Sequence, residues 1–219
     1  MSVDAAAVPK KKGYWISQVV AIHDQDLFAK YVAEATPLFS PGNKYGAKFL
    51  VAGPVTKQFT GSPIIFGGVT EFDSLQLALD FFNDPAYVKA RANMGDDESA
   101  VVERRNCVIE GDELPPLTPG QGIWLAHVSA IGDPDKFGIY AGAPKPLIKA
   151  SALGPVHTQL TGKDKMIFAG AMVFDSKKIA EEMYTMPDYV AARAAAGMEP
   201  SEDDIVKRVI GVIEVPAAE

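Results

Sequence analysis

The chain has a single cysteine, three histidines and fewer basic than acidic residues, and each scarcity excludes a class of protein. One cysteine cannot form a disulfide within the chain, so the fold depends on its apolar core. Cys107 lies in an apolar run, which favours a buried, inert thiol over a nucleophile and is consistent with a reducing compartment. The formal charge of −7 disfavours nucleic-acid binding, because phosphates need a clustered basic surface.

Long apolar runs and long basic runs are also missing. No stretch approaches the roughly 18–20 apolar residues that span a bilayer. The short basic groups, each expected to lie on a solvated face, are Lys10–Lys12, Arg104–Arg105 and Lys177–Lys178. Residues 1–12 have no apolar segment behind their charges, so they indicate a flexible tail rather than a secretory signal. We therefore expect a soluble intracellular protein of the cytoplasm or an organelle stroma, and a cleaved targeting segment ahead of it is compatible with this sequence.

What the sequence does contain is an internal repeat. The segment 13–16 (GYWI) recurs as 122–125 (GIWL), and further matches follow in the same order. They include 53–55 (GPV) with 154–156, 72–74 (FDS) with 174–176, and 108–110 (VIE) with 212–214. An unbroken order over two such long stretches indicates a tandem duplication of one module.

A linker separates the two copies. Residues 111–121 hold three prolines and two glycines, a density that neither a helix nor a strand tolerates. We therefore expect five segments: a flexible N-terminal tail 1–12, a first repeat 13–111, a Pro-rich linker 112–121, a second repeat 122–215 and a C-terminal tail 216–219.

Each copy predicts the element order β-α-β-β-α-β. In the first copy the expected strands cover residues 14–22, 48–55, 64–72 and 101–110. Asp24 is the expected cap of a helix through residue 39, and Asp73 or Ser74 that of a second helix, which Pro85 interrupts. This order is a split βαβ unit, with an antiparallel sheet and both helices on one face.

The other face of such a sheet is apolar and uncovered. Large apolar patches are not left in water, so each sheet needs a partner. The duplication supplies that partner within the chain. We predict an α+β protein in which two ferredoxin-like repeats close face to face into an intramolecular α+β barrel, with the helices outside.

Several motifs of the first copy resemble the DUF1330 family. They are the opening at 13–16, the Asp24 cap, the stretch 45–50 (YGAKFL), the turn at 72–74, and 84–87 (DPAY) followed by Arg91. The resemblance implies the dimeric α+β barrel superfamily, whose single-domain members pair as homodimers. It covers residues 13–111 well and 122–215 more loosely, because the second copy lacks the YGAK stretch and has Met186 in place of Asp84. The family implies no settled activity.

The histidines do not have the spacing of a metal site. His23, His127 and His157 are not repeated, and no HxxxH or HxH pattern occurs. We therefore expect neither a metal nor a cofactor. For His127 a hydrogen-bonded strand histidine is the favoured interpretation, and a residue that lines a pocket is the alternative.

Arg91 and Arg193 are a polar pair that both copies keep. Each could clamp an anion at the mouth of its half of the barrel. Each could instead tie the second helix to the end of its repeat, for example through Glu110 and Glu214. The structural role is favoured, because exposed arginines more often form ion pairs of modest strength.

Two classes of function remain. In the first, the protein is non-catalytic and self-assembles or binds another protein through its surfaces, as a shell or scaffold component does; the tandem-domain shell protein around the diatom pyrenoid is an example. The absence of a convincing catalytic set favours this class, and the linker and residues 215–219 are candidate docking segments. In the second, the barrel interior binds a small apolar molecule and transforms it without a cofactor. Its working residues would be His127, Gln18, Arg91 and Arg193, with Trp15 and Trp124 as further ligand contacts.

Overall fold

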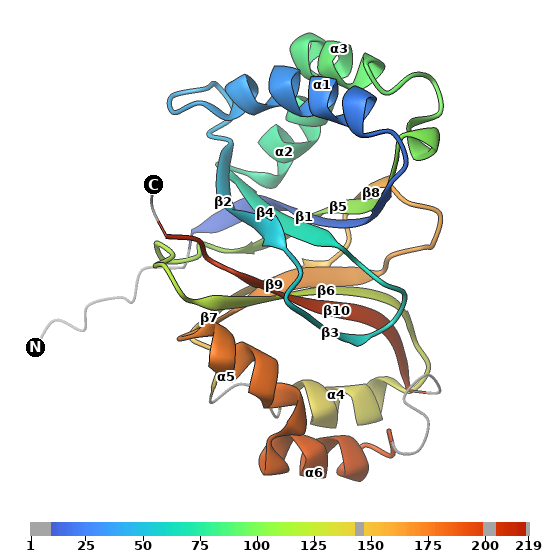
Figure 1. Ribbon diagram of the computed structural model, residues 1–219. Helices are drawn as coiled ribbons and strands as arrows, with labels where there is room; N and C mark the ends of the chain where they lie inside the picture. The colour runs from blue at the N-terminus through green and yellow to red at the C-terminus, as the bar shows by residue number, and fades with distance from the viewer. Residues whose placement is uncertain (1–9, 143–146, 199–204, 218–219) are drawn as a thin grey trace, which may run out of the picture.

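A computed structural model describes residues 10–142, 147–198 and 205–217 and shows four layers, with two sheets face to face and helices on both outer sides (Figure 1). The first repeat contains β1 (Lys11–Ile22), α1 (Gln25–Ala35), the 3-10 turn η1 (Thr36–Phe39), β2 (Lys48–Pro54), β3 (Lys57–Thr60), β4 (Phe66–Phe72), α2 (Leu75–Phe82), α3 (Pro85–Ala92), η2 (Glu98–Ala100) and β5 (Val102–Asp112). The second contains β6 (Gly122–Ile131), α4 (Pro134–Gly142), β7 (Ala150–Pro155), β8 (Thr158–Thr161), β9 (Phe168–Phe174), α5 (Lys177–Glu182), η4 (Met183–Thr185), α6 (Pro187–Ala195) and β10 (Val206–Glu214).

The predicted fold is confirmed. The expected strands and helices all form, and the two sheets are antiparallel throughout. Side-chain caps begin the helices where the sequence indicates: Asp24 accepts a hydrogen bond from the backbone of Leu27 at 2.9 Å. Of the two candidate caps before α2, Ser74 is the one that binds the helix, through the backbone N–H of Leu77 at 3.2 Å.

Each sheet takes its fifth strand from the other repeat. The order in the first sheet is β2-β4-β1-β5-β8, and in the second it is β3-β10-β6-β9-β7. The short strand β3 therefore pairs with β10 of the second repeat, and β8 pairs with β5 of the first. The sequence prediction left these segments outside the sheets, so the reciprocal exchange is an addition to it. Because every exchanged strand is hydrogen-bonded to the other half, the two repeats form one cooperative unit.

A repeated glutamine closes the turn that follows each exchanged strand. The Gln58 amide donates to the Gly61 carbonyl at 3.0 Å and accepts from the Ile64 N–H at 2.9 Å. Gln159 makes the same contacts with Gly162, at 2.7 Å, and with Met166, at 3.0 Å. Both glycines have positive φ angles, which L-residues with a side chain rarely adopt. The repeated Gln and Thr-Gly positions thus serve the strand exchange.

The space between the sheets is filled with apolar side chains. Tyr14, Ile16, Cys107 and Ile109 from the first sheet meet their counterparts from the second in one continuous cluster. The linker seals one end of this cluster, because Leu114 is buried in it. Val215 is buried there too, and its N–H donates to the Gln121 carbonyl at 2.8 Å. These contacts hold Leu114 and Val215 against the barrel.

Two expectations about charged segments are wrong. The strand β1 begins at Lys11, within the expected tail, and Lys12 is buried, with its ammonium 2.8 Å from the Asp73 carboxylate. The remaining tail residues 1–9 lie outside the described residues. Arg104 and Arg105 are both buried in β5, where a solvated pair was expected. Ion pairs with Asp73, Glu98 and Asp164 make this burial tolerable. Within the described ranges, no helix is long and apolar enough to cross a bilayer.

A substitution at Gly13 tests how closely the start of α2 packs against the first sheet. At Gly13 a Cβ atom would lie 2.4 Å from the carbonyl oxygen of Ser74, so Gly13→Ala must displace the start of α2. We expect it to lower the free energy of unfolding by about 1–3 kcal/mol. In the matched control, Gly138→Ala in α4, the new methyl group meets nothing within 4 Å, and stability should rise by up to about 1 kcal/mol. Urea denaturation of both variants measures this, and equal midpoints would contradict the packing.

Candidate functional site

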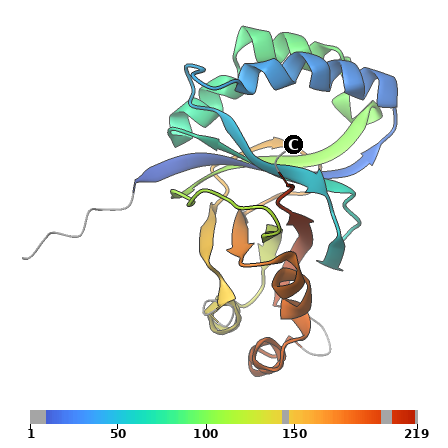
Figure 2. The same cartoon turned by 60° about the vertical axis from the view of Figure 1, so that its left-hand side comes forward.

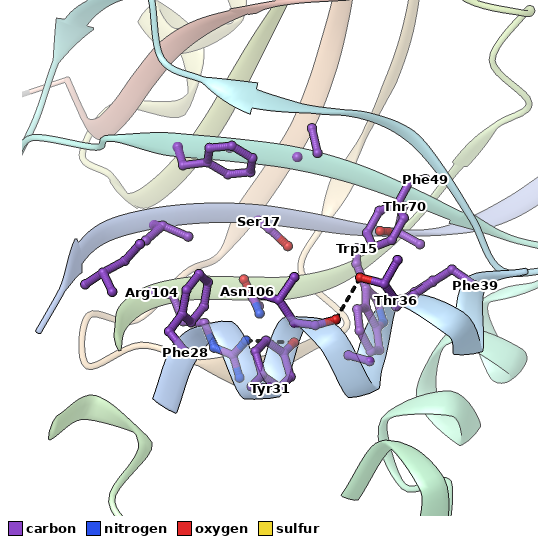
Figure 3. Close-up of a pocket in the computed structure, with 18 of the residues that line it drawn as sticks. Trp15, Ser17, Phe28, Tyr31, Thr36, Phe39, Phe49, Thr70, Arg104 and Asn106 are labelled. Atoms are coloured by element: carbon purple, nitrogen blue, oxygen red, sulfur yellow. Dashed lines mark hydrogen bonds between the residues drawn. The ribbon is translucent and has the colours of Figure 1, made fainter. Parts of the chain in front are cut away.

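A cavity of about 550 Å³ lies between the first sheet and helix α1. Its floor is the helix-facing side of β2, β4, β1 and β5, and α1 with η1 forms its roof (Figure 3). This is the outer side of the sheet, away from the second repeat (Figure 2). The lining is mostly apolar and rich in aromatic rings, among them Trp15, Phe28, Phe39, Phe49 and Phe66. Its volume falls in the range of about 300–1,000 Å³ that is usual for small-molecule sites.

The polar part of the floor comes from one row of residues across three strands. Ser17 on β1 lies opposite Gly68 on β4 and opposite Asn106 on β5. Because alternate strand residues face the same side, all three face α1, and Figure 3 shows Ser17 and Asn106 between the strands and this helix. In the next row Thr70 lies opposite Trp15, and both line the cavity. Gly68 adds no side chain, so the floor stays open at the β4 end of the row.

Asn106 is the unusual member of this row. Its side chain is buried, with 5% exposed, and it lines the cavity. Among the described residues its Oδ1 atom has no hydrogen-bond partner. Buried amide oxygens are almost always hydrogen-bonded, because burial without a partner costs about 1–3 kcal/mol. A ligand in the cavity is in position to supply the missing donor.

One wall of the cavity is a Tyr-Tyr-Arg group. The hydroxyls of Tyr31 and Tyr87 are 2.9 Å apart, and Arg104 Nη1 donates to Tyr31 Oη at 3.1 Å. Arg104 Nη2 also pairs with the Glu98 carboxylate at 2.7 Å. Burial, with the neighbouring Tyr31, raises the pKa of Tyr87 well above its usual value. Burial by itself would lower the pKa of Arg104, but Tyr31, Tyr87 and Glu98 raise it, so this guanidinium stays charged and is compensated by a carboxylate.

The second repeat has the same Tyr-Tyr-Arg group. The hydroxyls of Tyr140 and Tyr189 are hydrogen-bonded, and the guanidinium of Arg208 lies 4.4 Å from the centre of the Tyr140 ring. Val128 faces Arg208 across the strands just as Val19 faces Arg104. This group therefore belongs to the shared framework that joins the helices to the sheet.

The polar floor, in contrast, belongs to the first repeat alone. The row Gly68-Ser17-Asn106 is replaced by Gly170-Ala126-Ile210 in the second repeat, and the Thr70 position is occupied by Met172. Leu153 stands where β2 has Ala52, and a Cβ atom on Gly170 would lie 2.5 Å from its Cδ2 atom. Met172 and Ile210 are buried in the apolar cluster of that repeat. Larger apolar side chains thus occupy the positions that stay open or polar in the first repeat.

His127 and Gln18, which the sequence suggested as pocket residues, lie on the inner side of the sheets. His127 Nε2 is 3.6 Å from Cys107 Sγ, and Gln18 Nε2 donates to the Leu125 carbonyl at 3.2 Å. Burial lowers the pKa of His127 to about 3 and raises the pKa of Cys107 to about 12, so both side chains are uncharged at neutral pH. This contact serves the core, and neither residue lines the cavity under α1.

The two repeated arginines both stack on aromatic rings. The Arg91 guanidinium lies 4.0 Å from the Phe82 ring centre, and that of Arg193 lies 4.5 Å from the Tyr184 ring centre. Arg91 Nε also donates to Glu98 at 2.7 Å, so its carboxylate partner is Glu98 and not Glu110. A second cavity of about 360 Å³ beside Arg91 is lined by four acidic and three basic residues, which favours a structural arginine over an anion clamp.

The two tryptophans hold the helices to the sheets. Trp15 Nε1 donates to the Ala78 carbonyl at 3.1 Å, and Trp124 Nε1 donates to the Ala180 carbonyl at 2.6 Å. Trp15 also lines the cavity, so it is both a core anchor and a wall of the site. Across the described residues, no group of three metal-ligating side chains comes together.

Neither Ser17 nor its neighbours on the floor, Thr70 and Asn106, was predicted from the sequence. The predicted residues were titratable or aromatic side chains, and those that both copies share, such as Arg91 and Trp15, hold the framework together. The useful signal was the opposite one: helix-facing strand positions that are polar in the first copy and apolar in the second. Ser17 against Ala126, Thr70 against Met172 and Asn106 against Ile210 are the three such differences on this floor.

Comparisons with known families agree with this architecture. Residues 12–111 match the family described as "Domain of unknown function (DUF1330)". The chain contains a DUF1330 domain. This domain comprises the first repeat and includes every residue that lines the cavity. No curated protein matches the chain.

One solved structure has the same fold, and two others are more distantly similar. An anthrone oxidase-like protein is 10% identical, with a TM-score of 0.55 over 94% of this chain and 91% of that one. Chlorite dismutase from Candidatus Nitrospira defluvii, in complex with imidazole, is 12% identical, with a TM-score of 0.44 over 93% and 91%. A protein of unknown function from Rhodopseudomonas palustris is 18% identical, with a TM-score of 0.37 over 51% and 88%. At these identities the likeness concerns the fold of dimeric α+β barrel proteins and not their activities.

Because His127 is buried, we predict that the stability of the folded protein depends on pH. Since the pKa of His127 is about 3 in the folded protein and 6.5 as the reference value, acid protonates the unfolded chain first and stability falls below about pH 6.5. Between pH 7 and pH 5 this loss is about 2 kcal/mol. His127→Gln, which places the residue of the other copy there, should remove that part of the slope. Urea denaturation at both pH values measures it, and equal slopes would contradict the assignment.

Proposed function

We propose that the protein binds a small, largely apolar molecule in the cavity under α1. The observation that supports this most is the buried Asn106 amide oxygen, which has no partner among the described residues, in the floor of an apolar cavity of about 550 Å³. The second repeat supports it as well, because the same framework there accommodates Met172, Ile210 and Leu153 at the equivalent positions. The hollow is therefore a property of particular side chains in the first repeat and not a requirement of the fold.

The lining fits recognition by shape and apolar contact. Aromatic rings from β1, α1, η1, β2 and β4 surround the space, and buried aromatic surface contributes strongly to binding. The polar groups are few and grouped on the floor and one wall, which is the usual division of roles in a small-molecule site. Arg104 is already bound by Glu98, which also pairs with Arg91, so a ligand would have to compete with that carboxylate for the guanidinium.

Filling the cavity tests this function. We expect Ala52→Leu with Thr70→Met, the residues of the second repeat, to weaken binding of the neutral fluorescent probe N-phenyl-1-naphthylamine at least tenfold. The added side chains occupy the ligand's space, and thermal unfolding should be unchanged or shifted upward because voids are removed. Probe fluorescence at rising protein concentration measures the affinity.

The control is Ala92→Leu, the same kind of change on the exposed side of α3 and away from the cavity. It should bind the probe as the unaltered protein does. Unaltered binding by the filled variant, or no binding by the unaltered protein, would refute the proposal.

A second candidate function is self-association, as a structural or scaffold protein. The observation that favours it is a group of large apolar side chains around the cavity mouth, each between 40% and 50% exposed: Val32, Phe49, Ile65 and Phe66. Clustered apolar exposure of this kind marks interaction surfaces. The buried free thiol of Cys107 fits the intracellular compartment that either function would use.

Solution size distinguishes the two candidates. If this mouth is an interface between copies, light scattering should give a mass that rises with protein concentration, and Ile65→Lys should lower that mass by placing a charge in the contact. The charge-matched control is Val190→Lys on the exposed side of α6, which should leave the mass unchanged. A monomer at every concentration would refute self-association and leave ligand binding unaffected.

A further inference from the structure

We infer that the ligand is an uncharged apolar compound with one hydroxyl or similar group that donates a hydrogen bond to Asn106. This inference rests on the proposed binding function and adds the chemical class of the ligand. It follows from three features of the cavity: the state of the Asn106 amide, the neighbouring hydroxyl of Ser17, and the balance of charge along the wall.

The floor requires a donor from the ligand. Asn106 Oδ1 is buried and accepts from no described residue. The cross-strand neighbour Ser17 has its hydroxyl in the same row, on the same side of the sheet. A hydroxyl oxygen both donates and accepts, so one group on the ligand satisfies the amide oxygen and the serine together. A purely hydrocarbon ligand would leave the amide oxygen without a partner, which a site of this type disfavours.

The wall does not call for a negative charge on the ligand. The only positively charged group that lines the cavity, among the residues described, is Arg104. Its guanidinium is held by the Glu98 carboxylate at 2.7 Å and by Tyr31 at 3.1 Å. The same Glu98 carboxylate also binds Arg91, so one carboxylate serves two guanidinium groups. A carboxylate ligand would still have to compete with Glu98 for Arg104, and it would lose its water in an apolar space, which is costly. The cost of this desolvation favours a neutral head group.

Comparison with the second repeat indicates that Ser17 and Asn106 serve ligand binding and not the fold. Its floor keeps the arginine, both tyrosines, the tryptophan and the glycine, but has Ala126 and Ile210 in place of Ser17 and Asn106. The two polar floor residues are thus dispensable for building the sheet and the helices above it. Their replacement by apolar residues in the first repeat is expected to leave the fold intact, which makes them suitable for a binding test.

The test compares three probes of one shape: naphthalene, 2-naphthol and 2-naphthoate, each measured by equilibrium dialysis at pH 7. The unaltered protein should bind 2-naphthol about fivefold to tenfold more tightly than naphthalene, the usual effect of one hydrogen bond to a buried group. It should bind 2-naphthoate at least tenfold more weakly than 2-naphthol. In Asn106→Leu, a change of similar shape, the preference for 2-naphthol over naphthalene should disappear while naphthalene binding is kept.

Ser17→Ala is the milder variant, which removes one hydroxyl and almost no volume; it should reduce the preference for 2-naphthol without abolishing it. Thermal unfolding of each variant checks that the fold is kept. Equal binding of naphthalene and 2-naphthol by the unaltered protein, or an unchanged preference in Asn106→Leu, would overturn the assignment while the binding function stands. Tighter binding of 2-naphthoate would overturn the neutral class. If none of the three probes binds, the proposed function itself fails, and this inference fails with it.

Discussion

The mutual burial of two sheet faces is the constraint on which the rest of this structure depends. A four-stranded sheet with both helices on one side has an apolar face that must be covered, and here each repeat covers the other. The exchanged strands β3 and β8 add hydrogen bonds to this apolar contact, so neither sheet is complete without the other repeat. Side chains on the inner faces, such as Tyr14, Cys107 and His127, are consequently committed to packing.

This commitment leaves the helix-facing sides free to differ. Each outer layer is formed by one sheet and its own helices. A substitution in that layer does not change the packing between the two sheets. The framework that joins each layer to its sheet is the same in both repeats: a tryptophan bonded to a helix carbonyl, two tyrosines bonded to each other, and an arginine beside them. Within that framework the floor can be polar and open or apolar and filled.

The sequence predicted the fold well because the duplication repeated each structural signal. Both copies contain the helix caps, such as Asp24 and Ser74 in the first, and the apolar periodicity of the strands. A coincidental match between the copies was therefore excluded. The exchanged strands were missed because they are only four residues long and carry one apolar residue each, Phe59 and Leu160, so no period separates them from a turn. Their pairing depends on the partner strand, which lies more than forty residues away in the chain.

The candidate site was harder to predict for a different physical reason. Residues such as Asn106 stand out only when burial and the lack of a partner are both known, and neither follows from sequence. The titratable residues that drew notice first, His127 and Arg91, turn out to be engaged in the core and in an ion pair. Arg104 looked like part of a solvated pair because its neighbour Arg105 is also basic, although the two side chains point to opposite sides of β5.

An open cavity in the first repeat is a physical cost. Its apolar lining stays partly in contact with water, and the Asn106 Oδ1 atom has no partner among the described residues; each of these lowers stability. In the second repeat Met172 and Leu153 lie over the equivalent floor, and Ile210 stands at the amide position. A ligand with an apolar body and a hydrogen-bond donor would offset both costs in the first repeat at once. The difference between the two repeats is therefore the observation that most supports a binding site under α1.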